Sequence, residues 1–360
     1  MIPLYKPYMP QSLPELQNIL YSGALSYGKW GRNFEQKLVD FIGLPNIGVV
    51  NSFNSAMLVV LATLDIKPGD EIIASPMSCL ASNQPFASVR AKVVWADIDP
   101  STGTLCPESV KAKISGNTKA IFHNHHCGYP GYIDEINTIG KEKGIYVIDD
   151  AIEAFGAEYK GKMMGNTGTD ATVFSFQTVR MPNTIDGGAF SFSDAGLFEK
   201  ACVIRDLGVN RAIFRDAMGE ISAKCDITDI GYGATLSEPY GYIGSVQIDE
   251  LNSLIEKQRA NASEWSRKIM SEKPDLKLLS TSQSYPNYWV FGVLSNNKVK
   301  TIIDFKEIGF NASGVHLPNN NYSVFKNDEE LPGVNEFYNQ FVALPSGWWF
   351  DIKNLNEVNV

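Results

Sequence analysis

The sequence has little cysteine, no surplus of basic residues and no long apolar run. Its five cysteines are scattered without any Cys-x-x-Cys spacing, which argues against a disulfide framework or a zinc site. The net charge of −9 argues against nucleic acid or an anionic membrane as the main partner, although it leaves open a local basic pocket for a small anion. The start is quickly polar, so we expect no signal peptide and no membrane span. These absences favour a reduced, cytoplasmic protein.

The 360 residues, 44% of them hydrophobic, can bury a sizeable core. Two stretches carry most of the chemistry. In Ile145–Glu153 an apolar run ends in two carboxylates, and in Ala171–Phe192 a strand, a polar loop, a glycine pair and a returning strand follow one another. Such strand ends meet at one edge of a sheet, where α/β proteins bind ligands.

These two stretches resemble the DegT/DnrJ/StrS sugar aminotransferases. In that family a run E-D-A-A-Q-A-H-G-A is followed by F-S-F, by a lysine four residues beyond the second Phe, and by a G-[DE]-G-G turn. This chain has Asp149–Ala157, Phe174–Phe176 and Asp186–Gly188 in register, with Arg180 at the lysine position. The resemblance covers nearly the whole chain.

The resemblance implies the pyridoxal-phosphate (PLP) type I aminotransferase fold. We therefore expect an α/β architecture with a mostly parallel sheet in a large domain, residues 1–240, and a smaller C-terminal α/β domain, residues 241–360. It also implies a homodimer in which loops of each subunit complete the other's site. The partner would be a nucleotide-linked sugar.

Arg180 decides which chemistry remains open. A guanidinium stays protonated, forms no stable Schiff base and is a poor general base, so it replaces neither task of the family's lysine. It is suited to anchoring a carboxylate or phosphate with two hydrogen bonds, or it simply fills the space. In some dehydratases of the family histidine replaces this lysine and pyridoxamine phosphate (PMP) binds without a covalent bond. We accordingly expect PLP or PMP bound non-covalently, or no cofactor.

The resemblance places the other cofactor contacts at five residues. The family's Ser-Gly-Thr phosphate cup is replaced here by Ser-Phe-Asn, and we expect the Phe53 side chain to crowd the approach to the amides at Phe53 and Asn54. Leu80 stands where an aromatic side chain stacks on the ring. Asp150 is the predicted partner of the ring nitrogen, and Ser175 is a predicted phosphate donor.

Glu153 and His125 are the further candidates for catalysis. Glu153 replaces the family's usual Gln, and partial burial is expected to raise its pKa. His125 matches the family's His before a Gly. His123 and His125 would share one face of an extended segment without His126, and no carboxylate or cysteine completes a familiar ligand spacing. We therefore expect no metal there, and instead a polar pocket wall or a hydrogen-bonded core role.

The resemblance also places a glycine-rich loop near the substrate, which makes Tyr27, Lys29 and Trp30 candidate contacts, although an ordinary helix connector explains this loop at least equally well. Three hypotheses for the function follow. The first is an enzyme that acts on a nucleotide-linked keto-sugar, for surface polysaccharide or glycoside synthesis, by a route other than lysine-dependent transamination. The second is a catalytically silent homologue that binds a sugar nucleotide or a partner aminotransferase. The third is an ordinary PLP-dependent sugar transaminase whose catalytic Lys was artificially replaced at Arg180.

Overall fold

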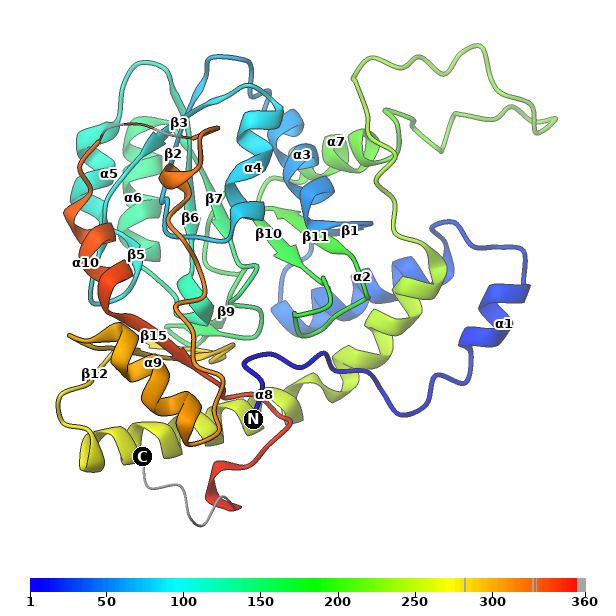
Figure 1. The fold of residues 1–360 in the computed structure, drawn as a ribbon. Coiled ribbons are helices and arrows are strands. Elements are labelled where there is room, and N and C mark those ends of the chain that lie inside the picture. Colours follow the sequence, from blue (N-terminus) through cyan, green and yellow to red (C-terminus); the bar gives the residue numbers. More distant parts are fainter. Residues whose placement is uncertain (282, 326, 328, 355–360) are drawn as a thin grey trace.

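The computed structural model describes residues 1–281, 283–325, 327 and 329–354. A seven-stranded sheet lies at its centre (Figure 1). In chain order its strands are β1 (Ile47–Val50), β2 (Glu71–Ala74), β3 (Lys92–Trp95), β6 (Thr118–Asn124), β7 (Tyr146–Asp150), β10 (Ala171–Ser175) and β11 (Gly188–Phe192).

The strand order is β1-β11-β10-β7-β6-β2-β3. Strand β11 is antiparallel to both of its neighbours, whereas the pairs from β10 to β3 are all parallel. The predicted α/β fold with a mostly parallel sheet is therefore confirmed. The helices are α1 (Leu16–Tyr21), α2 (Lys29–Ile42), α3 (Phe53–Thr63), α4 (Leu80–Ser88), α5 (Pro107–Lys113), α6 (Ile133–Lys143), α7 (Ala195–Arg205), α8 (Glu238–Glu272), α9 (Lys298–Glu307) and α10 (Pro332–Gln340).

The central strands are apolar without alternation because both faces of the sheet are covered. Along β7, Val147 packs with α5 and α6 on one face, whereas Ile148 belongs to the cluster with α3, α4 and α7 on the other. The same alternation separates Val49 from Val50 in β1, where Val49 packs with α2 and α8. Polar residues therefore stand mainly at the two ends of these strands.

The helix α8 is 35 residues long and leads to a second layer of structure (Figure 1). A three-stranded antiparallel sheet, β12 (Lys277–Leu278), β14 (Phe291–Leu294) and β15 (Phe341–Leu344), packs there with α9 around Trp265. The predicted domain boundary at residue 240 stays a prediction. The remaining strands are short: β4 (Ile98–Asp99), β5 (Thr104–Leu105), β8 (Glu158–Tyr159), β9 (Lys162–Met163) and β13 (Ser284–Tyr285).

Two segments project from the body of the molecule in Figure 1: the region of α1, and the long connection between α7 and α8. This connection, residues 206–237, contains no helix and only isolated bridges. Within the residues described, no helix is both long and apolar enough to cross a bilayer.

Candidate active site

The carboxyl ends of β6, β7 and β10 lie side by side and bring their polar residues to one edge of the sheet. In the β6–β7 register His123 is opposite Asp149, and Asn124 is opposite Asp150. Strand β10 ends beside β7 at Ser175, which is 3% exposed. The structure thus brings together the strand ends that the sequence singled out.

Asp150 is almost completely buried and its two oxygens are held separately. The Ser82 hydroxyl donates to Oδ2 at 2.6 Å, and the backbone N–H of Ile152 donates to Oδ1 at 3.2 Å. Burial raises the pKa of Asp150 to about 7, although the hydrogen bond from Ser82 opposes this rise. A cationic ring nitrogen beside the carboxyl group would favour its ionised form. Leu80 begins α4, two residues before Ser82, and is 41% exposed.

Glu153 is the centre of a buried network of polar groups. Its Oε2 accepts a hydrogen bond from the Cys127 N–H at 2.7 Å, while Oε1 lies 3.0 Å from His316 Nε2 and 3.4 Å from Arg180 Nη1. Burial alone would raise the pKa of Glu153, as the sequence led us to expect. That expectation is wrong in its net direction, because His316 and Arg180 outweigh burial and hold the pKa below its usual range. Glu153 is thus an ionised anchor.

Arg180 is only 7% exposed, and aromatic rings fix its position. Its guanidinium lies 4.3 Å from the ring centroid of Trp289, which is stacked on Tyr5 at 4.6 Å. The indole N–H of Trp289 donates to the carbonyl oxygen of Val179, the residue before Arg180. Cation–π contact, carboxylate pairing and this hydrogen bond together hold the arginine in one place.

The beginning of α3 is the place that the resemblance gives to the cofactor phosphate. Ser52 caps the helix, with its Oγ accepting from the Ser55 N–H at 3.1 Å. As the first two helical residues, Phe53 and Asn54 have no acceptor for their N–H groups within the helix. Phe53 is 5% exposed and belongs to the largest hydrophobic cluster. The expected crowding of the anion by this side chain is therefore not observed, because its ring is part of the core.

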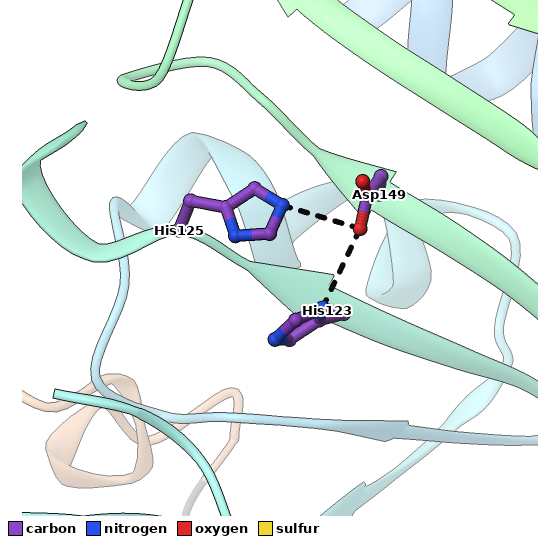
Figure 2. A group of neighbouring side chains, drawn as sticks. All are labelled: His123, His125 and Asp149. Atoms are coloured by element: carbon purple, nitrogen blue, oxygen red, sulfur yellow. Dashed lines mark ion pairs between the residues drawn. The ribbon is translucent and has the colours of Figure 1, made fainter. Parts of the chain in front are cut away.

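His123 and His125 both face Asp149, which lies on the neighbouring strand (Figure 2). The carboxylate Oδ1 is 3.4 Å from His123 Nδ1 and 3.2 Å from His125 Nε2, and Thr167 donates to Oδ2. Burial alone would raise the pKa of Asp149, but the two imidazoles outweigh it and lower the pKa. All three side chains are completely buried.

This arrangement brings a carboxylate to the two histidines, which the sequence had not indicated. The Gly131 N–H donates to His125 Nδ1 at 3.1 Å, so a neutral His125 carries its proton on Nε2, facing Asp149. A metal at Nε2 would displace that proton. The hydrogen bond from Gly131 therefore disfavours a metal at Nε2, although His123 Nδ1, His125 Nε2 and Asp149 Oδ1 have no hydrogen-bond partner among the residues described. The predicted catalytic role of His125 stays a prediction.

A second group that could hold a metal consists of His126, Cys127 and Glu153. All three residues are buried, and burial lowers the pKa of His126 to about 3 while it raises the pKa of Cys127. The Arg180 guanidinium pairs with the carboxylate of this group. A fixed positive charge next to that ligand disfavours a divalent cation.

The three predicted substrate residues lie at the start of α2. The N–H groups of Trp30 and Gly31 donate to the Glu238 carboxylate at 2.9 to 3.0 Å. The N-terminus of α2 therefore already binds a carboxylate of the protein. Tyr27 donates to Glu35 at 2.5 Å, and Lys29 lies over the Trp30 ring. Among the residues described, their contacts are with α2, α7 and α8 rather than with the Arg180 network. Their role in binding substrate stays a prediction.

A profile of the DegT/DnrJ/EryC1/StrS aminotransferase family matches residues 9–358. The chain belongs to this family. The spore coat polysaccharide biosynthesis protein SpsC of Bacillus subtilis (strain 168) is 30% identical over 255 residues, which are 69% of this chain and 65% of that protein.

Two further family relatives cover almost the whole chain. The dTDP-4-dehydro-2,3,6-trideoxy-D-glucose 4-aminotransferase of Saccharopolyspora spinosa is 26% identical over 355 residues, which are 96% of this chain and 91% of that enzyme. The crystal structure of the sugar aminotransferase CalS13 from Micromonospora echinospora superimposes with a TM-score of 0.91 and 25% identity. That match covers 99% of this chain and 97% of the other. The type I aminotransferase fold is thereby shown.

Against this family background, four residues of the site were missed by the sequence reasoning. His316, Trp289 and Tyr5 surround the Arg180–Glu153 pair, and Ser82 holds Asp150. His316 is the one histidine outside the cluster of three, which is a weak signal that was available. The others are ordinary apolar or small residues in sequence, and only their packing reveals them.

Proposed function

We propose that this aminotransferase-family protein acts on a nucleotide-linked keto-sugar, for surface polysaccharide or glycoside synthesis, without a covalent bond to a cofactor at residue 180. The observation that carries the proposal is the buried Arg180 guanidinium, paired with Glu153 and stacked on Trp289. No primary amine stands at this position. The names of the relatives support the substrate class, because one is named for spore coat polysaccharide biosynthesis and another for a dTDP-linked sugar.

PLP or PMP would fit this site at two of its three expected anchors. Asp150 would face the ring nitrogen, and the α3 amides with Ser175 would hold the phosphate, while Leu80 would cover the ring. Such a cofactor, when bound, withdraws electrons from the substrate carbon. At the third anchor Arg180 offers a fixed positive charge instead of a nucleophile. The proposal is therefore non-covalent PMP or PLP.

Within the site, the chain's own residues hold charge and exclude water. The ionised Glu153 fixes Arg180 and His316, and the Tyr5–Trp289 stack covers the guanidinium. Neither Glu153, whose pKa is lowered, nor Arg180 is suited to shuttling a proton between two carbons. This same observation supports the second candidate function, a silent homologue that binds a sugar nucleotide or a partner aminotransferase.

We further propose a cytoplasmic homodimer. The five cysteines are all free, as expected for a reducing compartment. The connection between α7 and α8 exposes several large apolar side chains, and exposed apolar patches of this kind mark protein interfaces. Among them are Ile213, Met218, Ile221 and Ile230.

Calorimetric titration with PMP, PLP and nucleotide-linked sugars, followed by turnover assays, tests the proposal. We expect a saturable PMP or PLP complex that gel filtration removes, and conversion of a 4-keto-sugar nucleotide. Borohydride treatment with PLP should leave no cofactor-sized mass increase on the peptide that contains residue 180. Sugar-nucleotide binding without turnover would favour the silent homologue. A stoichiometric adduct on that peptide would refute the non-covalent route.

A further inference from the structure

The Arg180 guanidinium has more hydrogen-bond donors than partners. It carries five N–H donors, yet among the residues described here it makes one hydrogen bond, to Glu153 at 3.4 Å. Its Nε is buried and has no acceptor in that same part of the chain. Buried donors without acceptors are costly and rare in native structures. We therefore expect the free N–H groups of Arg180 to donate to a hydrogen-bond acceptor on a bound ligand.

The guanidinium is also oriented before any ligand arrives. The guanidinium carbon lies 4.3 Å from the centroid of the Trp289 ring, which stacks with Tyr5 and donates its indole N–H to the carbonyl oxygen of Val179. Contact with the ring does not use up the N–H donors. Such an immobile, planar fork matches the two oxygens of an oxyanion with little further loss of entropy.

A small cavity of about 10 Å³ adjoins this arginine. A space of that size holds roughly one water, so a ligand group would enter with movement of the lining. Arg180 and Lys6 are its two cationic side chains, and its lining contains no carboxylate. The other lining residues include Tyr5, Tyr8, Trp289 and Trp348, with Lys6 over the Trp348 ring. A positive, aromatic pocket of this kind favours a small anion attached to a carbon skeleton.

The neighbouring carboxylates do not supply acceptors for the remaining N–H groups of Arg180. Glu153 shares its charge among the Cys127 N–H, His316 and Arg180, and Glu250 accepts a hydrogen bond from the Tyr8 hydroxyl. A phosphate already has its proposed place at the start of α3. We propose that Arg180, with Lys6, binds the carboxylate of an acidic sugar, so that the substrate is a nucleotide-linked uronic acid. This inference rests on the proposed function and narrows its substrate class.

The experiment compares two nucleotide sugars that differ only at the carboxylate. Calorimetric titration with UDP-glucuronate and UDP-glucose should show binding of the uronate that is tighter by about tenfold or more. In Arg180→Gln the two sugars should bind with about equal affinity. Arg180→Lys keeps the charge but loses the fork, and should retain part of the preference. Arg267→Gln removes an exposed arginine that pairs with Glu264, and should change nothing.

The double variant Arg180→Gln/Glu153→Gln controls for misfolding, since it leaves no buried charge of this pair unbalanced. It should still bind UDP-glucose and still lack the preference. Equal binding of both sugars by the native protein overturns the carboxylate inference and leaves the proposed function standing. Failure to bind either sugar also overturns the uronic-acid inference, whereas the proposed function is judged separately by the titrations with PMP and a keto-sugar nucleotide. A preference that survives in Arg180→Gln places the carboxylate elsewhere and also overturns the inference.

Discussion

Arg180 Nη1 and Glu153 Oε1 lie 3.4 Å apart, and each residue is more than nine-tenths buried. Two charges removed from water in this way attract each other strongly, but the gain is offset by the cost of removing them from water. The pair is thus a poor source of stability and a strong constraint on chemistry. It keeps a permanent positive charge at the position that the resemblance gives to an amine.

We expect Glu153→Gln to destabilise the protein by about 3–5 kcal/mol, because it leaves the Arg180 charge buried without an anion. Arg180→Gln should cost less, since His316 and the Cys127 N–H still hold the carboxylate. The double variant should be less destabilised than the sum of the two single variants by about 1–3 kcal/mol. Chemical denaturation of the four proteins measures this coupling. Additive effects would show that the two groups do not interact.

Restoring the lysine alone should not create a transaminase. In Arg180→Lys the ionised Glu153 would hold the new side chain as an ammonium ion, which is not a nucleophile. The double variant Arg180→Lys/Glu153→Gln removes that carboxylate and supplies the amide of the family pattern, so it should bind PLP covalently to a greater extent. Absorption spectra with PLP, and amino transfer from glutamate to a 4-keto-sugar nucleotide, measure both variants. A fully active single variant would instead support the hypothesis of an artificially replaced lysine.

The sequence was sufficient to predict those structural features that depend on one continuous stretch of the chain. The apolar run before Asp150 predicted a buried strand and the placement of that carboxylate at the sheet edge, because parallel strands are covered on both faces. It was insufficient where distant segments meet. His316 reaches Glu153 from 163 residues away, and nothing in either local pattern fixes that contact. The predicted direction of the Glu153 pKa shift failed for this reason.

Phe53 shows a different kind of failure. Its place at the start of a helix, where a phosphate would bind, suggested a side chain that faces the ligand. However, the first turn of a helix also has a side that faces the core. In α3 Phe53 lies on that side and packs in the core with Ala56 and Met57. Replacing Phe53 by Ala should therefore destabilise the fold by about 3–5 kcal/mol rather than clear a phosphate site. Thermal unfolding and PMP titration of this variant distinguish the two effects.

Asp150 should make stability depend on pH between the ordinary pKa of its carboxyl group, 3.8, and its raised pKa of about 7. Its pKa is raised from 3.8 to about 7, so between these values the folded state holds a proton that the unfolded state releases. Stability contributed by the protonated group is complete below pH 3.8 and is lost as the pH rises through 7. The free energy of unfolding of native protein should therefore fall by about 2–3 kcal/mol more than that of Asp150→Asn when the pH is raised from 5 to 8.

Glu153 affects stability in the opposite direction and at lower pH. Its pKa is lowered by folding, so the ionised carboxylate stabilises the fold above pH 4.5, and this stability is lost only as the pH falls below 4.5. Denaturant unfolding of both proteins at several pH values measures the difference. Asp65→Asn is the matched control, since this aspartate is exposed and its pKa is lowered rather than raised. Parallel pH profiles for the native protein and Asp150→Asn would contradict the buried, protonated state.

The proposed homodimer predicts a specific weak point in the connection between α7 and α8. Ile230 is 87% exposed in the single chain, and an interface that buries it would lose apolar contact and gain an unpaired charge in Ile230→Asp. We expect light scattering at micromolar concentration to give a dimer for the native protein and a shift towards monomer for this variant. Met270→Asp, at a 66% exposed position in α8, should remain dimeric. Because loops of one subunit are proposed to complete the other's site, loss of the dimer should also weaken sugar-nucleotide binding. A native protein that is monomeric under these conditions would refute the shared site.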